Sequence, residues 1–143
     1  MSRFFPLAVV VAFHLLCLQL GSTALVPPRV IIIVSGIPKP SSLKLHCLSK
    51  GDDRGVHWLS YGDEYYWEVY IPDNSTYYPV PSYFCSFNSG SKRQLLTVYD
   101  SARDASCKNI NDKHECFWFV SDDGFFFRND AQAQHYQKIA GWA

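Results

Sequence analysis

The chain has 143 residues, and its 13 basic and 13 acidic side chains give a formal net charge of zero. This balance excludes the broad basic surface that attracts nucleic acid or an anionic membrane. Aromatic residues make up 16% of the chain, which favours β-structure because these side chains suit pleated, half-buried surfaces.

The first 24 residues have the pattern of a secretory signal peptide. Arg3 supplies a positive start, Phe4 to Leu20 is almost wholly apolar, and Ser22 to Ala24 offers small residues for cleavage. The apolar stretch is short for a spanning helix, which needs roughly 20 uninterrupted apolar residues. We therefore predict cleavage after residue 24, no membrane insertion after signal removal, and one secreted, extracellular domain over residues 25–143.

The rest of the chain contains short apolar segments separated by turn signals. The earlier strands are predicted at Arg29–Val34, Leu43–Cys47, Val56–Tyr61 and Tyr65–Ile71, with a turn at Gly51–Gly55. The later strands are predicted at Ser82–Asn88, Gln94–Asp100, Glu115–Ser121 and Phe125–Arg128. Loops are expected at 71–81 and 101–113, and the tail from Asn129 predicts a short helix or a frayed end. About eight short antiparallel strands at this spacing predict an all-β, small β-sandwich.

Alternation also predicts which side chains are buried. Leu43, Leu45 and Cys47 should face inward, with Lys44 and His46 outward. Tyr65, Trp67, Val69 and Ile71 form a second inward set, and Tyr83, Cys85 and Phe87 form a third. Asp123-Gly124 between two apolar runs indicates a hairpin.

Four cysteines lie outside the leader: Cys47, Cys85, Cys107 and Cys116. An even number of cysteines after an export signal indicates a disulfide framework. Three pairings are possible, and the sequence does not choose among them; in one, Cys107–Cys116 closes a loop while Cys47–Cys85 joins two strands. The cysteine spacings fit no zinc template, so we expect no metal site.

Candidate reactive groups do not form a known catalytic pattern. The histidines outside the leader are His46, His57, His114 and His135, and no nucleophile elbow, zinc-protease motif or phosphate loop accompanies them. We therefore expect no enzyme and no cofactor. Asp52-Asp53 and Asp122-Asp123 could ligate calcium, although Asp beside Gly is also typical of turns. Asn74-Ser75-Thr76 is a predicted glycosylation site.

Several segments together resemble the plant self-incompatibility S-protein homologue family. They are His46-Cys47-Leu48-Ser49-Lys50-Gly51-Asp52-Asp53-Arg54-Gly55-Val56-His57, Tyr83-Phe84-Cys85-Ser86-Phe87, Val98-Tyr99-Asp100, Cys107, Cys116-Phe117-Trp118-Phe119-Val120 and Asp123-Gly124-Phe125. The resemblance covers about Arg29 to Arg128. It implies a secreted β-sandwich with two disulfides, it supplies no catalytic residue, and it suggests an extracellular signalling role.

The sequence and the resemblance lead to one main hypothesis and two alternatives. The main hypothesis is an extracellular ligand that binds an unidentified cell-surface receptor protein through its loops. The candidate recognition residues are Asp52, Asp53, Arg54, Asp73, Tyr77, Tyr78, Arg103, Asp104 and Lys108. A secreted carbohydrate-binding module or hydrolase is the first alternative, which a row of exposed Trp or Tyr on one sheet face, or two facing carboxylates, would favour. A toxin-like secreted peptide is the second.

Overall fold

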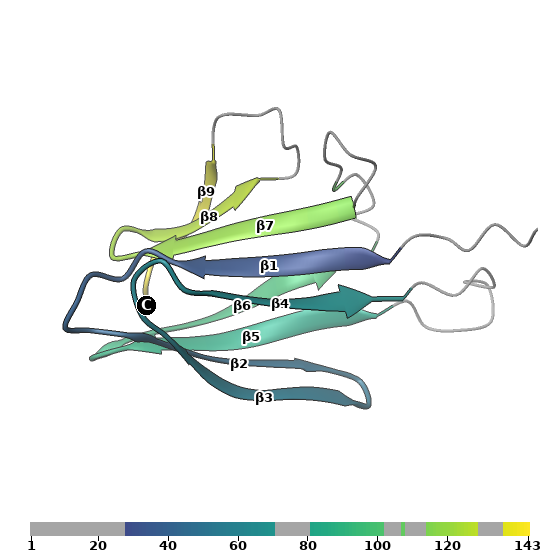
Figure 1. Cartoon of the computed structure of the whole chain (residues 1–143), viewed down its shortest axis with the longest axis horizontal. Helices are drawn as coiled ribbons and strands as arrows, with labels where there is room; N and C mark the ends of the chain where they lie inside the picture. The colour runs from purple at the N-terminus through teal and green to yellow at the C-terminus, as the bar shows by residue number, and fades with distance from the viewer. Residues whose placement is uncertain (1–27, 71–80, 102–106, 108–113, 129–135) are drawn as a thin grey trace, which may run out of the picture.

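A computed structural model describes residues 28–70, 81–101, 107, 114–128 and 136–143 of the chain. In these ranges the protein consists of nine strands arranged in two sheets that face each other (Figure 1). The described part contains no helix that is long and apolar enough to cross a membrane. The prediction of an all-β sandwich is confirmed.

One sheet has five strands in the order β4-β1-β7-β8-β9, and the other has four in the order β3-β2-β5-β6. The five-stranded sheet contains β4 (Glu64–Val69), β1 (Arg29–Ser35), β7 (His114–Ser121), β8 (Gly124–Arg128) and β9 (Gln137–Ala140). The four-stranded sheet contains β3 (Asp52–Leu59), β2 (Leu43–Ser49), β5 (Ser82–Ser89) and β6 (Lys92–Asp100).

The core lies between the sheets and follows the predicted alternation. Leu43, Leu45 and Cys47 on β2 are fully buried, with relative exposures of 0%. Tyr83, Cys85 and Phe87 on β5 are buried as well, and the predicted inward Trp67 and Val69 also belong to the core. Trp118 on β7 donates from Nε1 to the Val98 carbonyl on β6 over 2.8 Å, so a hydrogen bond joins the two sheets inside the core.

Three features of the fold differ from the sequence prediction. β1 pairs in parallel with β7, with Arg29 opposite His114, so the prediction of antiparallel pairing is wrong for this pair. The predicted turn at Gly51–Gly55 is shorter than expected, because β3 already begins at Asp52. The described end of the tail, residues 136–143, is neither helical nor frayed, because Gln137–Ala140 forms β9 against β8, while residues 129–135 lie outside the described ranges.

The last residues of the chain contact both sheets. Trp142 donates from Nε1 to the Ser121 carbonyl over 2.8 Å, and its ring packs on Phe125 with a centroid distance of 4.7 Å. Ala143 donates its backbone N–H to the Arg93 carbonyl over 2.9 Å. Residues 141–143 therefore connect the β7–β8 hairpin of one sheet to strand β6 of the other.

Two disulfides lie in the sandwich, and both are buried. Cys47 and Cys85 are bonded to each other and are also register partners on β2 and β5. Cys107 and Cys116 are bonded, which attaches Cys107 to β7. This is the pairing that would close a loop and join two strands. Buried disulfides of this kind fit an extracellular protein.

Candidate functional site

The free end of the β2–β3 hairpin carries the most developed polar network among the described residues. We call its members the hairpin-end cluster: His46, Asp52, Asp53, Arg54, His57, Tyr65 and Tyr83. The chain turns at Lys50-Gly51, where Gly51 adopts a positive φ of 78°, which glycine tolerates best. Asp52, Asp53 and Arg54 follow this turn directly as the first residues of β3, so all three lie at the end of the hairpin.

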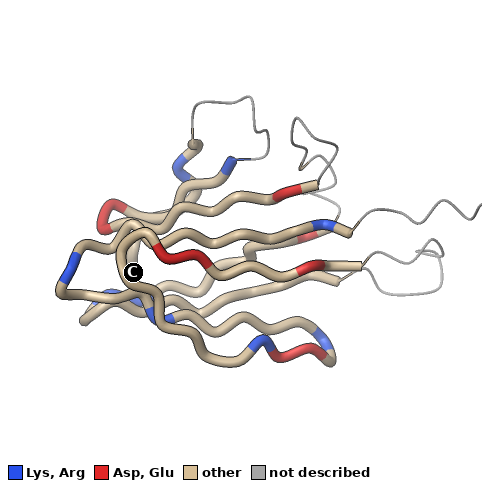
Figure 2. The backbone as a smooth tube through the Cα atoms, in the orientation of Figure 1, with Lys and Arg blue, Asp and Glu red and all other residues tan. Residues whose placement is uncertain are grey.

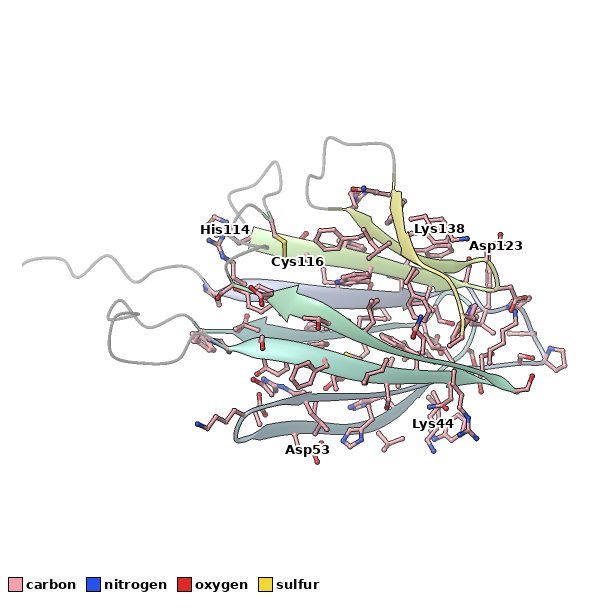
Figure 3. The ribbon with its side chains drawn as sticks, turned by 180° about the vertical axis from the view of Figure 1, so that it is seen from behind. Lys44, Asp53, His114, Cys116, Asp123 and Lys138 are labelled. Atoms are coloured by element: carbon pink, nitrogen blue, oxygen red, sulfur yellow. A yellow bond between two sulfur atoms is a disulfide. The ribbon has the colours of Figure 1, made fainter. Side chains whose placement is uncertain are left out.

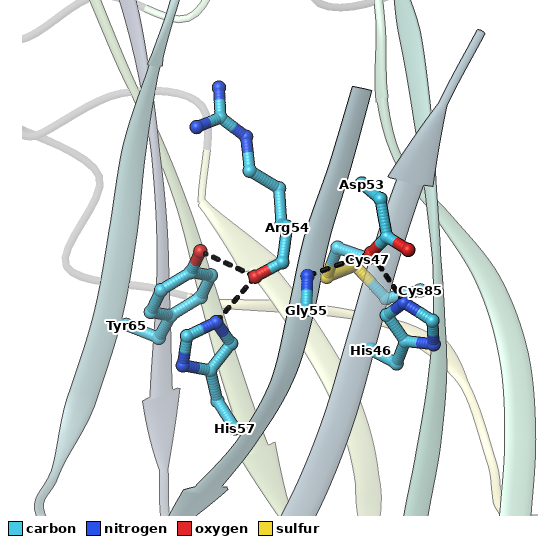
Figure 4. Close-up of polar contacts among 8 residues, drawn as sticks. All are labelled: His46, Cys47, Asp53, Arg54, Gly55, His57, Tyr65 and Cys85. Atoms are coloured by element: carbon cyan, nitrogen blue, oxygen red, sulfur yellow. Dashed lines mark hydrogen bonds and ion pairs between the residues drawn. A yellow bond between two sulfur atoms is a disulfide. The ribbon is translucent and has the colours of Figure 1, made fainter. Parts of the chain in front are cut away.

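Asp53 is an exposed carboxylate in a fixed position. Its Oδ1 accepts the Gly55 backbone N–H over 2.8 Å and contacts His46 Nε2 at 2.6 Å (Figure 4). The Gly55 hydrogen bond, followed by the His46 hydrogen bond, lowers the pKa of Asp53 below its ordinary value. The Asp53 side chain is nevertheless 63% exposed. It therefore presents a stable negative charge to solvent.

Asp52 connects the hairpin to its neighbouring strand. Its Oδ2 accepts the Tyr83 hydroxyl of β5 and lies 3.0 Å from Arg54 Nη2. Burial of the phenol, and then its hydrogen bond to Asp52, raise the pKa of Tyr83, so the hydroxyl remains a donor at neutral pH. The Asp52 carboxylate is thus held between a phenol and a guanidinium.

The backbone of Arg54 connects β3 to the other sheet. Its carbonyl oxygen accepts hydrogen bonds from His57 Nε2 at 2.6 Å and from the Tyr65 hydroxyl at 3.4 Å. The rings of His57 and Tyr65 stack with their centroids 3.7 Å apart. Because β3 and β4 are edge strands of different sheets, these contacts close one side of the sandwich next to the exposed charges.

The cluster is suited to recognition by charge and shape. His46 Nε2 contacts Asp53 and His57 Nε2 contacts the Arg54 carbonyl, and no Ser, Thr or Cys nucleophile belongs to the cluster. No group of three or more His, Cys, Asp or Glu side chains suited to a metal ion occurs within the described ranges. What the cluster offers a partner is one exposed carboxylate beside a paired carboxylate and guanidinium.

The two acidic pairs do not form one calcium site. Asp53 lies on the four-stranded sheet, whereas Asp123 lies at the β7–β8 turn of the other sheet, well separated in Figure 3. Asp122 is 3.0 Å from Lys92 Nζ and is thereby paired. The Asp123 backbone N–H donates to Ser121 Oγ, as turn geometry requires.

Only part of the predicted recognition surface lies in the described residues. The structure brings together Asp52, Asp53 and Arg54. The remaining candidates lie outside the described residues, and so does the glycosylation site: Asp73, Asn74, Tyr77, Tyr78, Arg103, Asp104 and Lys108. The strand ends that border the segments 71–80 and 102–113 lie at the same end of the sandwich as the β2–β3 turn (Figure 1).

Sequence reasoning missed the residues that hold the cluster in place. The sequence predicts Tyr65 and Tyr83 only as inward-facing core residues, and it assigns His57 no partner. No local signal identifies them, because Tyr83 reaches Asp52 from a position 31 residues away. Figure 2 shows acidic and basic residues side by side at this hairpin end, whereas elsewhere charges are scattered.

The exposed aromatic residues are distributed over several elements. Trp58, Tyr61, Tyr66, Tyr70 and Phe84 are all at least 45% exposed. Trp58 lies on β3 and Phe84 on β5, while Tyr66 lies on β4 in the other sheet. This distribution differs from the row of Trp and Tyr on one face that a carbohydrate-binding module would present.

Comparisons with known proteins place the chain in a family. The family model for plant self-incompatibility protein S1 matches residues 30–142. S-protein homolog 6 of Arabidopsis thaliana is 36% identical over 87 residues, covering 59% of this chain and 56% of the relative. S-protein homolog 5 of the same plant is 32% identical over 82 residues, covering 57% of each protein.

The chain therefore spans little more than half the length of these relatives. No solved structure matches it. The family match covers most of the chain, both sheets and both disulfides, and it agrees with the resemblance carried by the hairpin segment and the cysteine-flanking strands. The chain belongs to the plant self-incompatibility protein S1 family.

Proposed function

We propose that this S-protein homologue is a secreted ligand that binds a receptor protein on a cell surface and catalyses no reaction. The observation that carries the proposal is the hairpin-end cluster, in which exposed charges are held by hydrogen bonds to β5 and β4. Charges that are already fixed lose little conformational entropy when a partner binds. Complementary charges also exclude wrong partners and speed encounter.

The predicted loops at 71–81 and 101–113 complete the proposed recognition surface. The support for including them is that the strands bordering them have these ends at the same end of the sandwich as the β2–β3 turn (Figure 1). Loops carried on a rigid scaffold are where binding function is usually found. We further propose that Asn74 in the first of these loops is glycosylated and that residues 1–24 are removed during secretion.

The test uses the oxidised chain lacking residues 1–24, labelled and applied to plant protoplasts. We expect saturable binding that is lost when the protoplasts are first treated with protease. Asp53→Asn should weaken this binding by about fivefold, the upper range for an exposed ion pair. Asp123→Asn is the matched control, because it removes an exposed carboxylate from the other sheet and should leave binding unchanged.

Two results would count against the proposal. Binding that never saturates, or that survives protease treatment, would mean that the partner is no receptor protein. Equal affinities for the Asp53 and Asp123 variants would show that the hairpin end does not contact the receptor. Reduced protein serves as a further control, since it lacks the disulfides that hold the scaffold.

A further inference from the structure

A second surface lies on the outer face of the four-stranded sheet, at the end away from the β2–β3 turn. Four side chains stand there in register, one from each strand: Trp58, Lys44, Asn88 and Arg93. Lys44 is the register partner of Trp58 on one side and of Asn88 on the other, and Asn88 is the partner of Arg93. We call these four residues the Trp58 row.

The row faces outward because its neighbours along each strand face the core. Leu43, Leu45 and Phe87 are buried on either side of it, so alternation turns Lys44 and Asn88 to the opposite face. Figure 3 shows Lys44 on the outer side of this sheet. Trp58 is 65% exposed, which leaves a large apolar side chain in contact with water.

The two cations of the row are not neutralised by the described residues. Lys44 Nζ lies 5.2 Å from the centroid of the Trp58 ring, and neither Lys44 nor Arg93 forms an ion pair in the described part of the chain. Lys92, the neighbour of Arg93, differs because it is 3.0 Å from Asp122. The row therefore presents two positive charges to an incoming ligand.

Two shallow depressions flank Asn88. The first has a volume of about 390 Å³ and is bordered by Lys44 and Trp58 together with the hydroxyls of Ser41 and Ser42. The second has a volume of about 290 Å³ and is bordered by Arg93 and Gln94. Asn88 borders both depressions, so they are adjacent on this face, and each has one cation on its border.

The chemistry of this site matches a linear ligand that carries repeated negative charges and hydroxyl groups. Lys44 and Arg93 are two strand spacings apart, about 10 Å. The serine hydroxyls and the side-chain amides can exchange hydrogen bonds with sugar hydroxyls. The exposed Trp58 ring can cover the apolar C–H face of a sugar ring and remove it from water. We propose that the Trp58 row binds an acidic, uronate-containing oligosaccharide.

Other occupants fit these features less well. If a second copy of the chain packed symmetrically on this face, the Lys44 and Arg93 side chains of the two copies would face one another and repel. Nucleic acid binding depends on many phosphate contacts, whereas this chain has equal numbers of basic and acidic residues. A protein partner could also bind to an exposed Trp and Arg. The protoplast binding of the Trp58→Ala variant distinguishes a protein from a saccharide.

The proposed saccharide site is separate from the proposed receptor surface. Asp53 lies next to the β2–β3 turn, whereas Trp58 lies near the other end of β3. Binding at one surface can be lost while binding at the other remains. The inference consequently does not depend on the proposed function.

The test is calorimetric titration of the oxidised chain with oligogalacturonate at low and moderate salt. We expect saturable binding that weakens as salt rises, because exposed charges are screened. Trp58→Ala should lower the affinity about tenfold, or ~1.4 kcal/mol. Lys44→Gln and Arg93→Gln should each lower it about two- to fivefold, as expected for exposed ion pairs.

Two matched control variants each remove one positive charge at a position outside the Trp58 row. Lys50→Gln changes the β2–β3 turn of the same sheet, and Lys138→Gln changes β9 of the other sheet; both side chains are exposed. Each control should leave the affinity within twofold. Thermal unfolding of every variant checks that a lost affinity does not reflect a lost fold.

Four outcomes would overturn the inference. The first is a wild-type chain that does not bind oligogalacturonate. The second is equal binding of the fully methyl-esterified oligosaccharide, which carries no charge. The third is an equal loss in the Lys50 and Lys138 variants, which would mean non-specific attraction. The fourth is a Trp58→Ala variant that keeps its oligosaccharide affinity but loses protease-sensitive protoplast binding, which would make this face a protein interface.

Discussion

The two disulfides stabilise regions of different kinds. Cys47 and Cys85 are bonded between adjacent strands that are already paired in register, and both lie in the core. Cys107 belongs to no strand; it is bonded to Cys116, and its carbonyl lies 3.2 Å from His114 Nδ1. The first disulfide thus reinforces an existing attachment, whereas the second provides one. Double variants of the two disulfides test this difference, and two smaller changes test the hairpin-end cluster that lies next to the first disulfide (Figure 4).

The largest effect is expected for Cys47→Ala with Cys85→Ala. This bond joins residues 38 apart, and the loop-closure model assigns such a loop about 4 kcal/mol of stability through the unfolded chain. Urea denaturation of the wild-type chain and of the double variant measures the loss in the free energy of unfolding. Since the β2–β5 ladder remains, we expect the variant to keep its strand pairing. A loss below about 1 kcal/mol would mean that the unfolded chain is already constrained in this region.

Cys107→Ala with Cys116→Ala should cost less but act more locally. A separation of 9 residues corresponds to about 2.5 kcal/mol in the same model. Hydrogen exchange should increase at the start of β7, because Cys107 then lacks its covalent attachment to that strand, while exchange in β2 and β5 stays slow. Increased exchange spread evenly over both sheets would contradict the proposed division between the regions.

Tyr83→Phe tests how β5, the strand that carries Cys85, supports the hairpin-end cluster. The change removes the hydroxyl that donates to Asp52, and we expect a loss of about 1 kcal/mol in the free energy of unfolding. Tyr66→Phe is the matched control, because Tyr66 is 62% exposed and should tolerate the change. Equal stabilities of the two variants would show that the Tyr83–Asp52 bond does not contribute to folding.

Asp53→Asn should produce the smallest effect, and it should depend on pH. A carboxyl group whose pKa is lower in the folded state stabilises the fold above its unfolded pKa, near 3.8, and this contribution is lost as the pH falls through the folded pKa. The melting temperatures of wild type and variant should therefore differ at neutral pH and converge in acid. His46→Asn should retain most of the pH dependence, because the Gly55 N–H is the larger cause of the shift. A melting-temperature difference between wild type and Asp53→Asn that persists in acid would contradict this pH dependence.

The parts of the fold that depend on local pattern were predictable from the sequence. β2, β4 and β5 alternate strictly, so their inward residues follow from the two-residue period of a strand. The β7–β8 hairpin follows from Asp123-Gly124 between apolar runs. The family resemblance also drew attention to Asp52, Asp53 and Arg54, which the structure brings together at the hairpin end.

The remaining features depend on distant partners. β9 has only four residues and little burial of its own, so its pairing with β8 decides its conformation. Asp52 has a turn preference, yet its register partner Ser49 and its contact with Tyr83 place it in a strand. The supports of the hairpin-end cluster come from β4 and β5, and nothing in the hairpin's own sequence identifies them.

The parallel pairing of β1 with β7 has a consequence for how the chain acquires its fold. β1 is the isoleucine-rich strand Arg29–Ser35, and its neighbour β7 begins only at His114. During synthesis, most of the domain is therefore made before β1 can pair with β7. Until then, the β7-facing edge of β1 is an unpaired apolar edge that can pair with other chains. Pairing strands so far apart in the sequence slows folding, because the entropy of closing the long connection is lost before the contacts form. We expect the yield of correctly folded protein to be limited by how well β1 is protected until β7 has been synthesised.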